Sequence, residues 1–311
     1  MAAIAWHFWP GVAMYDTLEQ YSQVLTGKVD DWHPPAMVRL WQLLRPLGPG
    51  ASPMFVLQVG LYAAGFSLII AALARCSRPF SGLAVLVLAI SPLLLGWQMV
   101  VLKDAQMLGA LIGAFAIILG CRLSGRRIPP PLALTAGLLL AYATLVRANA
   151  AFATVPLIVL IFPRPRSLIL RGGLALAIIG VVLALTPLAD RSLFGASNSG
   201  VAKSLPLFDL AAIAVAVPDA PGPFTRAERD QISKLHCVKD YFWDPLGDPT
   251  ACGPITERVR AEPETQLYAE LAHALIAHPL AYAAHRIRHW NSTERWLVAS
   301  GLPDMAPPDE T

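Results

Sequence analysis

The residues best suited to chemistry are a few ionisable side chains that stand beside long uncharged runs. Asp16 precedes the first full run, and a carboxylate there can act as a general base that removes a proton from an attacking hydroxyl. The same carboxylate can instead cap a helix, because Glu19 follows it with capping-box spacing. The residues alone leave both roles open, and a cap position would hold the base rigidly at a surface.

A second polar group, Asp30, Asp31 and His33, stands directly before Pro34-Pro35. Carboxylates and an imidazole at this spacing can bind a divalent cation or hydrogen-bond a phosphate. An ordinary solvated turn with a helix cap explains the same residues. The sequence therefore assigns no definite cofactor. A divalent cation bound at Asp30 and Asp31 stays one of the two alternatives.

Two further groups lie between apolar runs. Lys103 and Asp104 form one, and a lysine there can bind a phosphate as a point charge. Arg147 and Asn149 form the other, in a tight connection where a guanidinium can hold an anionic leaving group. Alternatively these charges only mark the membrane interface, the arginine reaching it by snorkelling.

The elements that must position these residues are membrane helices. The chain has 311 residues, of which 55% are hydrophobic and 14% charged, whereas soluble domains carry about 25% charged residues. Each uncharged run is near the roughly 17–25 residues of a spanning helix, and the runs are Met54–Ala74, Pro79–Leu102, Ala105–Cys121, Ile128–Val146, Ala148–Phe162 and Gly172–Ala189. The sequence therefore predicts an all-α polytopic transmembrane bundle with six clear spans. It gives no sign of a nucleic-acid partner, because the net charge is only +3.

The distribution of arginine predicts which loops face the cytoplasm. Arginines without acidic neighbours follow alternate runs, at positions 75 and 78, 122 to 127, and 164 to 171. By the positive-inside rule these loops are cytoplasmic. The loops that carry Asp16, His33, Lys103 and Arg147, and everything after Asp190, then share the outer face. We expect an integral protein of the bacterial inner membrane whose C-terminal region is extracytoplasmic.

The first outer loop is predicted to contain two interfacial helices. One begins at Asp16 and ends at Gly27, and Pro34-Pro35 opens the other. In the second helix Met37, Leu40, Trp41 and Leu44 form one apolar face suited to the membrane interface. Met1–Trp9 is apolar but too short to cross a bilayer. We expect a first span that is truncated by the choice of start site, and the alternative is a segment that only dips into the outer leaflet.

Residues 191–311 are predicted to form a small extracytoplasmic C-terminal region, and residues 1–190 the transmembrane domain. The helical pattern of Glu264–Trp290 is interrupted at Pro279, which makes it one helix or two. Cys237 and Cys252 both lie in this region, where an oxidising environment permits a disulfide. Two unrelated thiols are the alternative.

These motifs together resemble a known family. Asp16, Trp32-His-Pro-Pro35, Lys103-Asp104 and Arg147-x-Asn149 are similar to motifs of multi-span GT-C type glycosyltransferases, nearest to bacterial members related to the protein O-mannosyltransferase and lipid A aminoarabinose transferase group. The resemblance covers roughly residues 10–165 and, more loosely, Leu207-Phe-Asp209 and the cysteine pair. The family's later spans have no counterpart after Ala189, which predicts a compact variant or a fragment.

Membership would imply transfer of a sugar from a polyprenyl-phosphate donor to an acceptor hydroxyl on the extracytoplasmic side. Asp16 matches the position of the catalytic aspartate, and His33, Lys103 and Arg147 would then bind the lipid phosphate or the acceptor. Asp104 and Asn149 belong to the same expected substrate site. The alternatives are a transporter or flippase for a lipid-linked or anionic solute, and an accessory membrane subunit. Clean spans with charges at their ends favour the enzyme, since transporters place polar groups near the midplane of discontinuous spans.

Overall fold

The computed structural model describes residues 2–161, 167–217, 219–238, 252–294 and 297. Helices make up the secondary structure of these residues, and the only extended pairings among them are two isolated bridges. The chain divides into two compact units, Met1–Ser199 and Gly200–Thr311. The first unit extends past residue 190 because Ser197 pairs with the backbone of Val29 and Asp31.

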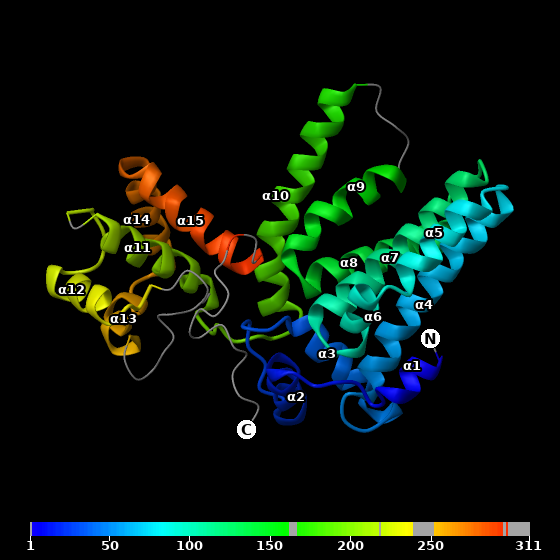
Figure 1. The fold of residues 1–311 in the computed structure, drawn as a ribbon, viewed down its shortest axis with the longest axis horizontal. Coiled ribbons are helices and arrows are strands. Elements are labelled where there is room, and N and C mark those ends of the chain that lie inside the picture. Colours follow the sequence, from blue (N-terminus) through cyan, green and yellow to red (C-terminus); the bar gives the residue numbers. More distant parts are fainter. Residues whose placement is uncertain (1, 162–166, 218, 239–251, 295–296, 298–311) are drawn as a thin grey trace. The chain divides into compact units, whose positions relative to one another are not determined.

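The first unit is a helical bundle in which α7 packs between α4 and α8 (Figure 1). Its helices are α1 (Ala2–His7), α2 (Tyr15–Thr26), α3 (Pro35–Leu44), η1 (Arg45–Leu47), α4 (Ser52–Arg75), α5 (Pro79–Ala89), α6 (Pro92–Met99), α7 (Lys103–Leu123), α8 (Pro130–Val146), η2 (Ala148–Ala150), α9 (Ala151–Ile161) and α10 (Leu168–Ser192). Small residues allow the close approach: Gly109 of α7 lies against the backbone of α4.

Three of these helices are long and apolar enough to cross a membrane, namely Ser52–Arg75, Lys103–Leu123 and Ile169–Ser192. The predicted span Pro79–Leu102 is instead two helices, α5 and α6, bent by 49°; Pro92 begins the second helix and has no N–H with which to continue the first. The pair raises the number of candidate spans to four. Helices α8 and α9 are apolar but shorter than a candidate span. The described residues thus contain three to four candidate spans, consistent with a polytopic helical membrane protein. Arg164 and Arg166, which were used to predict the orientation, lie outside the described residues.

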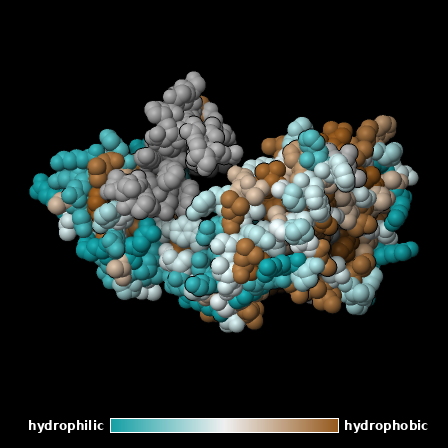
Figure 2. Space-filling view, turned by 90° about the horizontal axis from the view of Figure 1, so that it is seen from below, coloured by the Kyte–Doolittle hydropathy of each residue, from teal (hydrophilic) through white to brown (hydrophobic). Residues whose placement is uncertain are grey.

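Hydrophobic side chains cover much of the surface of this unit. Phe80 and Leu83 of α5 and Val56 and Leu68 of α4 are more than half exposed. Figure 2 shows the hydrophobic colour gathered densely over the end of the bundle that α4 and α5 form. Lipid tails can cover such a surface at no cost, because they are as apolar as the side chains themselves.

The first loop folds into two helices, as the sequence predicts, but Asp16 is not the cap of the first. That helix, α2, begins at Tyr15 after Met14, whose backbone N–H donates to the side chain of Thr17. Asp16 therefore lies inside the first turn, where the helix dipole favours a carboxylate. The predicted end is confirmed, since Gly27 takes a left-handed conformation with φ 72°.

The apolar face of α3 packs against protein. Pro35 begins the helix as predicted. Met37 and Trp41 are fully buried, and they pack with Val24 of α2 and with Met54 and other residues of α4. The interpretation of this face as a membrane-interface anchor was wrong for Met37 and Trp41, because the bundle itself supplies the apolar partner. The helix instead fixes α2 onto the end of α4.

The described residues of the second unit form six short helices around one apolar core. They are η3 (Val201–Lys203), α11 (Ser204–Ala216), α12 (Arg226–Lys234), α13 (Gly253–Arg260), α14 (Glu264–Ala277) and α15 (Pro279–Glu294). The core gathers Leu207, Ile213, Ile232, Val259 and Leu267 among others. Of the two predicted arrangements of Glu264–Trp290, the structure has two helices that meet at His278 and Pro279.

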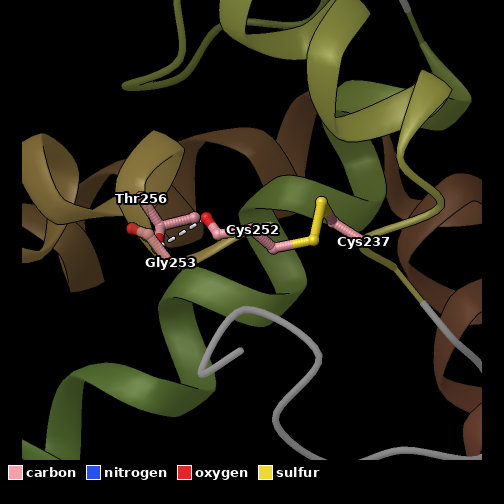
Figure 3. Close-up of a disulfide and its surroundings, with 4 residues drawn as sticks. All are labelled: Cys237, Cys252, Gly253 and Thr256. Carbon is pink, nitrogen blue, oxygen red and sulfur yellow. Dashed lines mark hydrogen bonds between the residues drawn. A yellow bond between two sulfur atoms is a disulfide. The ribbon is translucent and has the colours of Figure 1, made fainter. Parts of the chain in front are cut away.

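The predicted disulfide is confirmed. Cys237 and Cys252 are bonded, with their Cα atoms 5.7 Å apart, and both side chains are buried in the core of this unit (Figure 3). Beside the bond, the hydroxyl of Thr256 donates to the carbonyl of Gly253 at 3.0 Å. The disulfide thereby joins the end of α12 to the start of α13.

Candidate functional site

Asp16 and Lys103 form a direct ion pair. Lys103 Nζ lies 2.8 Å from Asp16 Oδ2, and the side chains are 17% and 35% exposed respectively. The pair joins the first turn of α2 to the first residue of α7. Two contacts fix this meeting: Val12 and Val100 pair as extended backbone, and Thr17 Oγ1 donates to the Val101 carbonyl at 2.8 Å. The carboxylate is therefore held in place while a third of its surface stays accessible.

The next residue, Asp104, contacts Arg147. Arg147 Nε lies 2.9 Å from Asp104 Oδ1, and both side chains are 38% exposed. The Nε–H bond does not point at the carboxylate, so this is a contact between charges and not an aligned hydrogen bond. Arg147 ends α8 in an extended conformation, which turns the chain into η2. Lys103 and Asp104 thus link two ion pairs, and they bring together four of the predicted site residues.

Asn149 makes no hydrogen bond or ion pair with this group within the described residues. It lies in η2, two residues beyond Arg147, and its side chain is exposed. Its predicted role in substrate binding stays a prediction.

His33 is the most buried of the predicted site residues. Only 2% of it is exposed, and within the described structure neither ring nitrogen has a hydrogen-bond partner. Burial lowers the pKa of His33, and the nearby positive charge of Lys103 lowers it further, against smaller opposing effects of Asp16, Asp30 and Glu19. A neutral imidazole has one N–H donor and one acceptor nitrogen. An imidazole buried in this way without partners is available for a ligand.

Asp30 and Asp31 take part in local hydrogen bonds. Asp30 Oδ1 accepts from the Gln23 amide at 3.2 Å and from the Trp32 backbone at 3.0 Å. Asp31 Oδ1 accepts from the N–H and the hydroxyl of Ser199 at 2.7 and 2.6 Å. Among the described residues, no three His, Cys, Asp or Glu side chains come together as metal ligands. Both carboxylates therefore serve to hold the loop, and a divalent cation at them stays a prediction.

Two hollows open next to these ion pairs. The first, which we call the acidic hollow, has a volume of about 220 Å³ and is lined by Tyr15, Glu19, Gln23, Asp30, Trp32, His33 and Ser199. The second, the apolar hollow, has a volume of about 380 Å³ and is lined by Trp97, Asp104, Ala105, Met107, Leu108 and Arg147. The two differ in chemistry. Among the described lining residues, the charged groups of the first are carboxylates, whereas the second is mainly apolar with one ion pair.

A buried set of uncharged polar residues was missed by sequence reasoning. Gln58 Nε2 donates to the carbonyls of Gln98 and Val100 at 2.8 and 2.9 Å. Gln106 Nε2 donates to the Met54 carbonyl at 2.9 Å and lies 3.3 Å from Gln58 Oε1. These bonds hold the break between α6 and α7, the segment that ends at Lys103. The only signal was glutamine inside an uncharged run, which a search for ionisable residues does not detect.

The second unit holds a further buried charge cluster. Asp209 is fully buried, and its two oxygens lie 3.2 Å from His285 Nε2 and 2.8 Å from an Arg286 terminal nitrogen. In the sequence, His285 and Arg286 belong to the basic stretch His285-Arg-Ile-Arg-His289. Asp209 joins α11 to α15, and removing one partner of such a buried group is strongly destabilising. We assign this cluster to the stability of the unit.

Comparisons with known proteins add no relative. No family model matches the sequence, and no match appears among curated proteins or solved structures.

Proposed function

We propose that the protein is an integral membrane glycosyltransferase that moves a sugar from a polyprenyl-phosphate donor to an acceptor hydroxyl. The observation that carries the proposal is the ion pair of Asp16 with Lys103, which fixes an accessible carboxylate at one end of a membrane bundle. A carboxylate so held is suited to take the proton of a hydroxyl. The motif resemblance of the same residues to GT-C type enzymes supports the assignment.

The proposed reaction is a single displacement. Asp16 takes the proton of the acceptor hydroxyl, the acceptor oxygen bonds to the anomeric carbon, and the bond from that carbon to the phosphate oxygen breaks. The electron pair leaves with the polyprenyl phosphate. Lys103 lies beside the base, and its ammonium has three donors, of which Asp16 occupies one. It can therefore stabilise the charge that develops on the phosphate.

The apolar hollow is the proposed place of the lipid phosphate. Trp97, Met107 and Leu108 offer an apolar surface to the first prenyl units, and Arg147 offers a cation to the phosphate. The guanidinium is already paired with Asp104, so the bound phosphate would have to compete with that carboxylate. We assign the site to the extracytoplasmic face of a bacterial inner membrane, on the strength of the arginine distribution between the runs.

A transporter of a lipid-linked or anionic solute is the second candidate. Two features favour it: the buried glutamines 58, 98 and 106, and the 49° bend between α5 and α6. Polar groups and broken helices inside a bundle are features of transporters. The ion pairs at the end of the bundle favour the enzyme.

The two functions separate in one experiment. Purified protein in liposomes is supplied with a polyprenyl phosphate that carries a radiolabelled sugar, together with a panel of acceptors, with and without a chelator. The enzyme moves label from the lipid phase to an acceptor and leaves free polyprenyl phosphate. A transporter would instead move the intact donor lipid from one leaflet to the other without transferring its sugar. An accessory subunit would neither transfer the sugar nor move the lipid. Either of these two results contradicts the proposal. Loss of transfer in the presence of a chelator would support the prediction that a divalent cation binds at Asp30 and Asp31.

A further inference from the structure

We infer that the acidic hollow is a binding site for an uncharged, polyhydroxylated group and that it excludes phosphate and carboxylate groups. The acidic hollow would then select neutral over anionic groups. That this group is the acceptor rests on the proposed function, whereas its binding in the hollow does not.

The observation that points to a ligand is His33. His33 lines the hollow, is 98% buried, and has no hydrogen-bond partner for either ring nitrogen within the described structure. A buried polar group without a hydrogen-bond partner destabilises the fold. We therefore infer that a ligand supplies the partner for His33. A neutral imidazole donates once and accepts once, and a hydroxyl offers the matching acceptor and donor.

The other lining groups fit a polyol as well. The carboxylates of Glu19 and Asp30 and the amide of Gln23 accept or donate hydrogen bonds at several angles around a ring of hydroxyls. Tyr15 and Trp32 bring two aromatic rings to the same hollow. Aromatic rings provide large, rigid apolar surfaces against which the C–H face of a sugar can pack.

The charges that line the hollow argue against an anion. Among the residues that the structure describes, the charged groups that line it are Glu19 and Asp30, and Asp31 follows Asp30 directly in the chain. Lys103 is a cation that acts on His33, but it pairs with Asp16 and does not line the hollow. A phosphate in the hollow would therefore meet like charges, with no lysine or arginine among the described lining residues to neutralise it. Proteins use such unpaired charges to reject ligands. This separates His33 from the phosphate-binding role that the sequence left open to it.

The proposal is tested by binding, without donor and without transfer. Detergent-solubilised full-length protein is titrated with neutral methyl glycosides of several common sugars, and each with its uronate and its 6-phosphate counterpart where these exist. Saturation-transfer NMR reports binding in the weak range expected for monosaccharides. The variants are His33→Phe, which keeps a buried ring but loses both nitrogens, and His273→Phe, a matched change at an exposed histidine of the second unit.

We expect at least one neutral glycoside to bind, its anionic counterparts to bind at least tenfold more weakly (about 1.4 kcal/mol), and the gap to narrow in high salt. His33→Phe should weaken neutral binding at least tenfold, with His273→Phe unchanged. Binding of the anions as tight as that of their neutral partners overturns the proposal. So does the absence of any neutral binding, or an unaffected His33→Phe. Asp16→Asn should keep this binding, so failure of the proposed reaction would leave it standing.

Discussion

The disulfide between Cys237 and Cys252 should supply much of the stability of the second unit. The two residues are separated by 15 positions, and in the chain-entropy model a loop of about 15 residues is worth about 3 kcal/mol. Loss of the bond should therefore raise the population of the opened unit on the order of a hundredfold, since each 1.4 kcal/mol is tenfold. The effect should be confined to α11 to α15, because the first unit has its own cores.

Hydrogen exchange of the intact protein measures this directly. The variant with both cysteines replaced by alanine is compared with the parent, and the backbone amides of Ile232 and Val259 are followed, since both lie in the buried core around the bond. We expect their exchange to accelerate on the order of a hundredfold while the amides of α4 and α7 stay unchanged. A matched control replaces Cys76 and Cys121, which are not bonded. Equal exchange in parent and variant would refute the estimate, and acceleration throughout both units would refute its confinement.

Three further predictions concern the site and its support. Gln58→Leu leaves two carbonyls without their donor, at about 1–3 kcal/mol each, and should speed the exchange of the amides around Val101 without unfolding α4. Arg147→Gln should raise the KM for the lipid donor at least about tenfold, because a charge-assisted phosphate contact is lost. The hydrogen bond from Arg258 lowers the pKa of Glu228 from 4.5 to about 2. Because the carboxyl is more acidic when folded, its contribution is complete above pH 4.5 and declines toward pH 2, so Glu228→Gln should flatten the acid limb of a thermal-unfolding profile.

Each of these has a clear contrary outcome. Unchanged exchange in Gln58→Leu would show that other bonds hold the break between α6 and α7, and Gln266→Leu at an exposed position serves as its control. A lower kcat with constant KM in Arg147→Gln would contradict a role in donor binding. If thermal stability falls with decreasing pH as steeply in Glu228→Gln as in the parent, groups other than Glu228 cause the loss of stability in acid.

The sequence predicts the helices and the location of the charged groups better than it predicts their contacts. The lack of charge in the runs predicts α4, α7 and α10, because apolar length is a local property. It does not predict the bend at Pro92, which depends on how α6 is held by Gln58 of another helix. The ion pair of Asp16 and Lys103 joins residues 87 positions apart. Shared sidedness predicts that they lie on one face, but the bridge between Val12 and Val100 and the hydrogen bond from Thr17 to Val101 bring them into contact.

Two interpretations of the local sequence differ from the fold for the same physical reason. They are the capping role, which was one of the two roles left open for Asp16, and the membrane-interface role of the apolar face of α3. In the fold, the cap position belongs to Met14, and Trp41 is covered by protein and donates its indole N–H to the Gly50 carbonyl at 3.1 Å. An amphipathic pattern indicates that a face will be covered, but not whether lipid or protein covers it. The pairing of Asp209 with His285 and Arg286 was missed because it joins α11 to α15 across tens of residues.

The most direct test of the central claim is the transfer rate of Asp16→Asn in liposomes with the labelled polyprenyl-phosphate donor. Asparagine keeps the size of the side chain and is tolerated in a first helical turn, but it cannot take a proton. Asp230→Asn, at an exposed position of the second unit, is the matched control. We predict that Asp16→Asn inserts and folds as the parent does and loses at least about a hundredfold of its rate, while Asp230→Asn keeps full activity. A folded Asp16→Asn protein that transfers sugar at the parent rate would contradict it.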